Sequence, residues 1–421
     1  MDTYLPRIID PIIEKHLASF GAVCVEGPKW CGKTWTSSQH SRSQIFLADP
    51  RGNFQNRNLA EMDPSLVLKG ESPRLIDEWQ EVPAIWDAVR FRVDETGKAG
   101  QFLLTGSATP KTKGILHSGA GRISTVRMRP MSLWESQDSS GDVSLQSLCS
   151  SRHLDAKMVE TPTLNQLTRL IVRGGWPAVL HQENPDITLI PQQYIHAVIN
   201  NDILRLDNIR RDSRKMLLLL KSLARNVATT VSDRTIMRDV KAVDDEDIDK
   251  MTVSAYMDVL RRLFITEDLP AFSTNLRSGS RLKKLEKRLF CDPSLACSLL
   301  GATPEILMND LETLGFLFES LCLRDLRIYA ESFGASLYHY QDYANREADA
   351  VVAMPDGNWC AFEVKLGANQ IDQAADSLKK LQASLKEAVP PKLLCVICGL
   401  SNAAYQRPDG VFVVPITALK D

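Results

Sequence analysis

The sequence has no excess of charge of either sign and no long apolar run. Lys and Arg number 50 against 52 Asp and Glu, which gives a formal net charge of −2 at pH 7. No global basic character therefore points to nucleic acid, and such a partner would have to be met by a local basic face. No apolar stretch reaches the roughly 18–20 residues of a membrane-spanning helix, so we expect no contact with a membrane.

The chain also shows no export signal and no disulfide framework. Its opening stretch, MDTYLPRIIDPIIEKHLASFG, carries charges throughout and lacks the apolar core of a signal peptide. The nine cysteines are odd in number and scattered, unlike those of disulfide-rich secreted domains. Cys395 and Cys398 form a C-x-x-C inside the apolar run LLCVICGL, which favours buried strand cysteines over a metal site. We therefore expect a cytoplasmic protein.

What the sequence does contain is a phosphate-loop pattern, G-x-x-x-x-G-K-T, within CVEGPKWCGKTW (24–35). GAVCVE before the pattern predicts a buried strand and TWTSSQH after it can open a helix, which is the context that the chemistry requires. Backbone N–H groups of such a loop point into one concavity at a helix N-terminus. Lys33 would contact the β- and γ-phosphates, and Thr34 would ligate Mg²⁺. The predicted nucleotide-binding residues of the loop are Gly27, Pro28, Lys29, Trp30, Cys31, Gly32, Lys33 and Thr34.

A second apolar stretch ends in two acids, as a phosphate-loop ATPase requires. In PRLIDEWQ, Leu75 and Ile76 precede Asp77 and Glu78. We predict that Asp77 binds in the Mg²⁺ shell and that Glu78 polarises the attacking water as general base.

A third predicted strand, QFLLTGSATP, ends in small hydroxyl residues. Ser107 is the predicted polar sensor of the γ-phosphate, and Thr105 is the alternative. A plain Gly-Ser turn at the end of a strand would give the same sequence.

The segments GPKWCGKTW, LIDEWQEVPAIWDAVR, LLTGSATP and HSGAGRI together resemble bacterial and archaeal AAA+-type P-loop ATPases. Members of that family carry a C-terminal domain of unknown function, and the resemblance covers nearly the whole chain. It implies ATP rather than GTP, in line with the absence of an N-K-x-D base-reading motif. Arg122 in HSGAGR is then a candidate arginine finger for a neighbouring subunit, which implies a homo-oligomer. An exposed arginine in a salt bridge is the alternative.

The middle of the chain is predicted to be a linker followed by helices. Eight serines lie between Ser132 and Ser151, which suggests a loop or linker. The Gly-Gly-Trp-Pro turn in RLIVRGGWPAVL is interpreted as a structural elbow. Thr252 is the predicted N-cap of a helix over 253–263, and the β-like FITEDL after that helix suggests a winged helix. Arg261 and Arg262 are then candidates for DNA phosphate contacts, although many ATPases use a winged helix merely as a lid.

The C-terminal third contains a second set of charged residues. Glu363 and Lys365 project from the same face of a predicted strand, and a hairpin at 355–357 returns Asp349 beside them. Two carboxylates and a lysine in this arrangement match the D…E-x-K pattern of restriction-nuclease-like, PD-(D/E)xK-type folds, in which Asp349 and Glu363 would bind a divalent metal. Glu319, in the preceding helix, is a candidate fourth ligand. An ion-paired face without metal would look the same, and such a fold can survive without its chemistry.

These features predict an α/β protein with several domains. Residues 1–135 form a P-loop ATPase core, a parallel sheet with flanking helices, and 136–166 a Ser-rich linker. Residues 167–270 form a helical, winged-helix region, and 271–421 an α/β restriction-nuclease-like domain. The favoured function is Mg²⁺-dependent ATP hydrolysis coupled to a C-terminal domain that binds or processes double-stranded DNA. The alternative is an ATP-regulated switch that binds a protein partner and cuts nothing.

Overall fold

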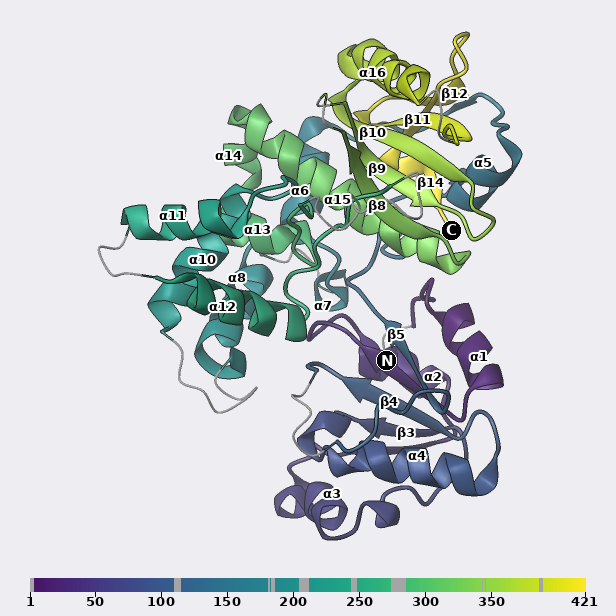
Figure 1. Ribbon diagram of the computed structural model, residues 1–421, viewed down its shortest axis with the longest axis vertical. Coiled ribbons are helices and arrows are strands. Elements are labelled where there is room, and N and C mark those ends of the chain that lie inside the picture. The colour runs from purple at the N-terminus through teal and green to yellow at the C-terminus, as the bar shows by residue number, and fades with distance from the viewer. Residues whose placement is uncertain are drawn as a thin grey trace. The chain divides into compact units, whose positions relative to one another are not determined.

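The computed structural model describes residues 4–109, 115–180, 182, 186–203, 212–243, 248–273, 285–342, 344, 346–385 and 389–421 (Figure 1). The chain forms two compact units. The first comprises Met1–Pro130, Asn200–Arg211 and Asp258–Ile265, and the second comprises Met131–Ile199, Asp212–Met257 and Thr266–Asp421. None of the helices in the described ranges is long and apolar enough to cross a membrane.

The first unit is a five-stranded parallel sheet with helices on it, in the strand order β2-β3-β4-β1-β5. Its strands are β1 (Ala22–Glu26), β2 (Ser43–Phe46), β3 (Arg74–Asp77), β4 (Phe102–Gly106) and β5 (Ile123–Arg127). Its helices and 3₁₀ turns are α1 (Asp10–Ser19), α2 (Lys33–Gln39), α3 (Arg51–Met62), η1 (Pro64–Leu66), η2 (Trp79–Glu81) and α4 (Ala84–Thr96).

The alternation of side chains along β1 places a hydrophobic core on both faces of this sheet. Cys24 joins a buried cluster that contains Ile85 and Val89 of α4. Val23 faces the other way, into a cluster with Ile13 of α1. A strand covered on both faces is apolar throughout, and this is why GAVCVE was recognisable as a strand. The parallel sheet with flanking helices is the α/β fold class that the sequence predicts.

The second unit combines a helical part with a mixed seven-stranded sheet in the order β7-β12-β13-β11-β10-β9-β8. Its strands are β6 (Val143–Ser144), β7 (Lys157–Met158), β8 (Ser336–Gln341), β9 (Glu347–Ala353), β10 (Trp359–Gly367), β11 (Leu393–Leu400), β12 (Ala403–Gln406), β13 (Phe412–Pro415) and β14 (Leu419–Lys420). Its helices include α5 (Leu145–Ser151), α6 (Leu164–Arg173), α7 (Pro177–Leu180), α8 (Leu189–Ala197), α10 (Ser213–Arg225), α11 (Asp233–Val243), α13 (Pro293–Leu300), α14 (Pro304–Asn309), α15 (Leu311–Ser332) and α16 (Ile371–Ser384), with 3₁₀ turns η5 (Ala368–Gln370) and η6 (Ile416–Ala418). Two further elements, the π-helical turn η3 (Val198–Asp202) and helix α12 (Lys250–Arg262), pass from one unit into the other.

Helices cover both faces of the second sheet. Cys398 of β11 belongs to a buried cluster that includes Ala375 and Leu378 of α16. The next residue, Gly399, points to the other face, where an added Cβ would lie 3.1 Å from the Phe318 ring of α15. Cys395 and Cys398 are both fully buried in β11, so the interpretation of this C-x-x-C as strand cysteines is confirmed.

The Ser-rich segment over 136–166 is not the linker that we expected. Within it, β6 pairs with β14 and β7 pairs with β12, while α5 buries Leu145, Leu148 and Cys149. One of the serines caps a helix, since the Ser144 side chain accepts a hydrogen bond from the Ser147 N–H at the start of α5. The segment is therefore part of the second unit, together with the helical part and the C-terminal sheet.

In the helical part, the predicted N-cap of one helix is wrong, whereas the predicted Gly-Gly-Trp-Pro elbow is present. Helix α12 begins at Lys250, and the Asp249 carboxylate accepts the Thr252 N–H at 2.7 Å, so Asp249 caps the helix and the prediction of Thr252 as N-cap is wrong. The expected elbow lies between α6 and α7, where a Cβ on Gly175 would lie 2.0 Å from the Met131 carbonyl oxygen. Only a residue without a side chain permits that close approach.

Candidate functional site

The predicted phosphate loop connects the end of β1 to the start of α2 in the first unit. A Cβ on Gly27 would lie 2.0 Å from the Met128 carbonyl oxygen, so no other residue fits there. Gly32 has a φ of 100°, a left-handed conformation that favours glycine. The two glycines of the pattern are thus required by the backbone path, and the predicted strand, turn and helix are confirmed.

The lysine of the pattern folds back across the loop. The Lys33 side chain is buried, and its Nζ donates a 2.8 Å hydrogen bond to the Pro28 carbonyl oxygen. An ammonium group that lies against the loop backbone in this way is placed to contact anionic oxygens that enter the loop.

Thr34 and Asp77 lie together where α2 begins and β3 ends. Oδ1 of Asp77 accepts hydrogen bonds from the Thr34 hydroxyl at 2.7 Å and from the Thr105 hydroxyl at 2.6 Å. Burial raises the pKa of the Asp77 carboxyl above its ordinary value, although the two hydroxyl hydrogen bonds act in the opposite direction. A hydroxyl and a carboxylate in contact are hard oxygen donors of the kind that Mg²⁺ prefers, so these residues fit the metal that the pattern implies.

Glu78 is held beside this pair in a strained conformation. Its φ of 57° and ψ of 48° are left-handed, which is costly for a residue with a side chain and is concentrated at functional sites. Its N–H donates to the Thr105 hydroxyl at 3.0 Å, and its carboxylate accepts the Ser107 hydroxyl at 2.8 Å. Each sensor candidate therefore donates a hydrogen bond to a different carboxylate: Thr105 to Asp77, and Ser107 to Glu78.

Gln80 is a site residue that the sequence reasoning missed. Its Nε2 donates to the Glu78 carboxylate and, at 3.3 Å, to the Ser107 hydroxyl. The available signal was its position two residues after Glu78, within the turn η2.

The structure does not bring Arg122 to the phosphate loop of its own subunit. The backbone oxygen of Arg122 accepts the N–H of Ala22, the first residue of β1, whereas the loop follows the other end of that strand. Its guanidinium donates a 2.7 Å hydrogen bond to Asp94 of α4, as the salt-bridge alternative expects. A role as a finger towards a neighbouring subunit stays a prediction.

The charged residues of the C-terminal sheet lie together on β9 and β10, as the strand alternation predicts. Lys365 Nζ is 2.7 Å from Glu363 and 3.6 Å from Asp349. Oδ2 of Asp349 also accepts the N–H of Val364 at 2.8 Å.

A second lysine, missed by the sequence reasoning, completes this cluster. Lys287 Nζ lies 2.5 Å from Glu319 of α15 and 3.7 Å from Asp349. Lys287 stands near the end of the basic run RSGSRLKKLEKR (277–288). Residues 277–284 lie outside the described ranges, but Lys287 and Arg288 are buried. Their burial could have been inferred from the stretch LEKRLF, in which apolar residues stand on both sides of the charged ones.

Two lysines face the three acids of this cluster, so the charges balance only when one of the acids is protonated. Burial, and then the charge of Asp349, raise the pKa of Glu363 to about 8 and that of Glu319 to about 7. Burial would also raise the pKa of Asp349, but Lys287 and Lys365 hold it below its ordinary value. Within the described ranges, no group of three or more His, Cys, Asp and Glu side chains is arranged to hold a metal ion. Ammonium groups face the carboxylates of Asp349 and Glu363 here, and a metal site at these two residues stays a prediction.

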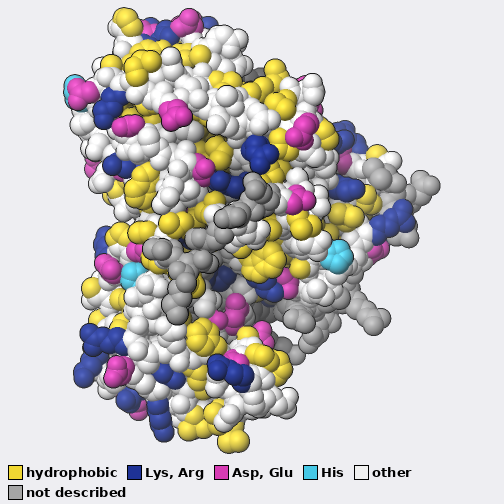
Figure 2. Space-filling model, turned by 180° about the vertical axis from the view of Figure 1, so that it is seen from behind, with side chains coloured by type: hydrophobic (Ala, Val, Ile, Leu, Met, Phe, Trp, Pro, Cys, Tyr) yellow, Lys and Arg dark blue, Asp and Glu magenta, His cyan; other side chains and the backbone are white. Residues whose placement is uncertain are grey.

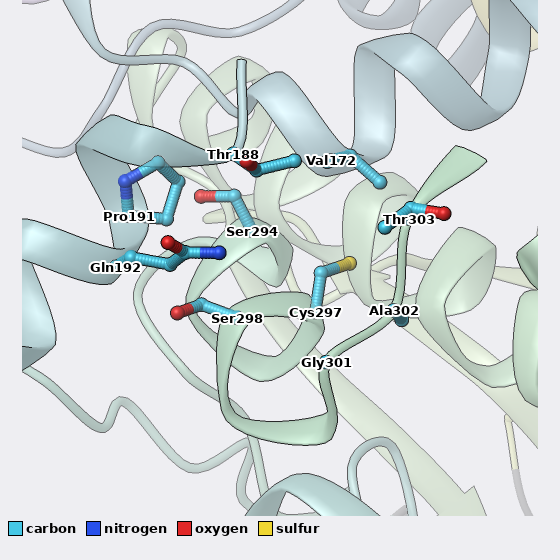
Figure 3. A pocket seen from close by; sticks show the side chains of 10 residues that line it. All are labelled: Val172, Thr188, Pro191, Gln192, Ser294, Cys297, Ser298, Gly301, Ala302 and Thr303. Atoms are coloured by element: carbon cyan, nitrogen blue, oxygen red, sulfur yellow. The ribbon is translucent and has the colours of Figure 1, made fainter. Parts of the chain in front are cut away.

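The second unit also contains a small cavity, shown in Figure 3. Its volume is about 40 Å³, which suits about one water molecule and is far below the size of a ligand pocket. The lining residues are Val172, Thr188, Pro191, Gln192, Ser294, Cys297, Ser298, Gly301, Ala302 and Thr303.

Comparison with known proteins matches three different family models to three separate parts of the chain. Residues 19–137 match a model described as an AAA domain. Residues 164–306 and 314–419 match two models described as domains of unknown function, DUF8612 and DUF4143. Two uncharacterized proteins, one of Mycobacterium tuberculosis and one of Mycobacterium bovis, are each 25% identical over 350 residues, which cover 82% of this chain and 70% of theirs. A Walker-type ATPase of Pyrococcus abyssi aligns with a TM-score of 0.42 and 14% identity, over 70% of this chain and 96% of its own.

The AAA-domain match covers the loop, the acidic pair and the sensor strand described above. Residues 19–137 are thus similar to AAA domains in sequence and carry the geometry of a phosphate-loop nucleotide site. This part of the chain is a P-loop ATPase domain.

Proposed function

We propose that the chain binds ATP with Mg²⁺, hydrolyses it, and passes its nucleotide state to the second unit. The observation that carries the hydrolysis is the connected set of hydrogen bonds that joins Thr34 to Asp77 and Ser107 to Glu78. A phosphate loop alone would only bind; a carboxylate oriented beside the metal-binding pair is what hydrolysis requires.

The roles of the individual residues follow from this geometry. Mg²⁺, held through Thr34 and Asp77, would neutralise charge on the phosphates. Lys33 would leave the Pro28 carbonyl for the phosphate oxygens, since a charged acceptor forms the stronger hydrogen bond. Glu78 would accept a proton from the attacking water, and Ser107 orients its carboxylate for that task. The direct test is ATP turnover by the wild type, measured with and without double-stranded DNA. Turnover by the wild type that equals turnover by Lys33→Ala would refute the assignment.

For the second unit we propose binding of double-stranded DNA through the helical part. Helices α10, α11 and α12 are followed by antiparallel bridges between Thr266 and Phe290 and between Leu269 and Lys287. Three helices followed by an antiparallel strand pair are the arrangement of a winged helix, which places a helix in a DNA groove. This arrangement supports the proposal, together with the basic run 277–288.

A protein partner remains the alternative, and two observations favour it. Arg262 is not placed for a phosphate contact, since its Nε donates to the Thr109 carbonyl oxygen at 3.0 Å and its side chain is 12% exposed. The face in Figure 2 shows acidic and basic side chains interspersed rather than a continuous basic surface. A binding titration at several salt concentrations separates the two, because contacts to DNA phosphates make affinity fall steeply with salt. Absence of binding to duplexes at low salt would leave the protein-partner alternative.

A further inference from the structure

A second lysine of the phosphate loop is held by an acidic side chain from a distant part of the chain. Lys29 lies in the middle of the loop, and its Nζ is 2.5 Å from Oδ1 of Asp202, the last residue of η3. Both residues belong to the first unit. The Asp202 side chain is 9% exposed, whereas that of Lys29 is 41% exposed. The carboxylate is therefore fixed and nearly buried, while the ammonium at the surface has room to turn.

Lys29 lies beside the part of the loop that the phosphate-binding lysine contacts. Lys33 is the loop cation that reaches the β- and γ-phosphates, and its Nζ lies against the carbonyl oxygen of Pro28, the residue directly before Lys29. The flexible four-carbon stem of Lys29 lets its ammonium reach either Asp202 or a phosphate oxygen on this side of the loop.

We propose that Asp202 and the terminal phosphate of ATP compete for the ammonium of Lys29. The γ-phosphate carries more negative charge than a carboxylate and offers more acceptor oxygens, so it draws the lysine away from Asp202. ADP lacks that group and leaves the ion pair intact. The inference rests on the proposed function, because the competition requires ATP in the loop.

The competition gives the chain a means of reporting which nucleotide is bound. Leaving a nearly buried carboxylate without its cation is energetically unfavourable. When ATP breaks the ion pair between Lys29 and Asp202, residues 200–203 therefore lose a contact with the loop. The chain passes from the second unit into the first at residue 200. The segment released by ATP is therefore one that leads directly along the chain to the second unit.

Calorimetric titration with a non-hydrolysable ATP analogue and with ADP, both with Mg²⁺, tests the competition. Asp202→Asn removes the competing charge and keeps the side-chain shape, so the Kd for the ATP analogue is expected to fall about tenfold, while the Kd for ADP stays unchanged. In a Lys29→Met background the same substitution is expected to have no effect. Glu95→Gln, in the exposed Arg92–Glu95 pair of α4, is the matched control for loss of one carboxylate.

Hydrogen exchange provides a second measurement, because a general change in charge would not alter the amide exchange rates of residues 200–203 specifically. Amides of residues 200–203 are expected to exchange faster in the wild type with the ATP analogue than with ADP, and equally fast with both in Asp202→Asn. The proposal is overturned if Asp202→Asn tightens ADP as much as the ATP analogue, or if its effect persists in Lys29→Met. If the wild type binds neither nucleotide, the proposed function itself fails, and the competition fails with it.

Discussion

The hydroxyl of Ser107 donates a 2.8 Å hydrogen bond to the carboxylate of Glu78, across the ends of two neighbouring strands of the first unit. This contact orients the acid that we assign as general base. Glu78→Gln keeps the size of the side chain but cannot accept the proton. We expect it to preserve ATP binding and to slow turnover by about 100-fold or more. Turnover is measured by phosphate release at saturating ATP.

Lys33→Ala is the complementary variant, and it should act on binding instead. Removing the buried ammonium leaves the loop without the cation that reaches the phosphates, so tight nucleotide binding is expected to be lost. Equal turnover in the wild type and Glu78→Gln would remove Glu78 from the role of base.

Arg122 lies level with the start of β1, away from its own phosphate loop, so a catalytic role is open to it only across a subunit interface. If it acts there, activity per subunit should rise with protein concentration. Mixing Arg122→Ala with Lys33→Ala subunits should then restore part of the turnover, because each variant keeps the half-site that the other lacks. No recovery in a mixture that demonstrably co-assembles would leave the ion pair with Asp94 as the role of Arg122.

The elements around the loop could be predicted because their chemistry is local in the sequence. Gly32 is fixed by its left-handed backbone within one turn, and β1 is apolar because it is covered on both faces. The same holds for Glu363 and Lys365, whose contact follows from strand alternation alone. Rules that act over a few residues, such as strand alternation, were therefore enough to predict most residues of both sites.

The partners that come from far along the chain could not be predicted. Asp202 meets Lys29 across 173 positions, and Lys287 meets Glu319 across 32, and neither Asp202 nor Lys287 lies in a motif. The Ser-rich segment was misread for a related reason: Val143 and Leu145 are buried by elements that follow much later in the sequence. Tertiary packing, and not local composition, determined these outcomes.

Arg324 is expected to be essential for the stability of the second unit. It lies 2.7 Å from both Asp292 and Asp325, and all three side chains are nearly or fully buried. Arg324→Leu leaves two buried carboxylates without their cation, which costs about 3–5 kcal/mol. Thermal or urea unfolding of the full chain measures the loss. Arg346→Leu, which breaks a partly exposed pair with Asp342, should cost about 1 kcal/mol or less. Equal effects of the two substitutions would contradict this prediction.

The C-terminal cluster should make the second unit less stable as the pH rises. Burial raises the pKa of Glu363 from 4.5 to about 8, so between these values the folded state binds more protons than the unfolded state. Stability is then lost as the pH increases through this window. Glu363→Gln mimics the protonated form and should reduce the loss between pH 5 and pH 8, where each unit of pKa shift corresponds to about 1.4 kcal/mol. Hydrogen exchange of the β9 and β10 amides measures it, and an unchanged pH slope in the variant would contradict it.

The last prediction is that the C-terminal cluster binds no divalent metal and cuts no DNA. A nuclease of this type needs two carboxylates that are free to bind Mg²⁺ or Mn²⁺. Here Lys365 lies 2.7 Å from Glu363, and Lys287 and Lys365 both face Asp349. A metal would have to displace an ammonium, and the proton of Glu363, from a site that is already neutralised. We therefore expect calorimetry with millimolar Mn²⁺ to give the same result for the wild type and Glu363→Ala, because any binding then belongs to Thr34 and Asp77, and we expect supercoiled, linear and single-stranded DNA to remain intact. The control is Glu363→Ala, assayed side by side. Cleavage by the wild type that disappears in Glu363→Ala would show that the D…E-x-K set is a working metal site, and the unit would then process DNA rather than only bind a partner.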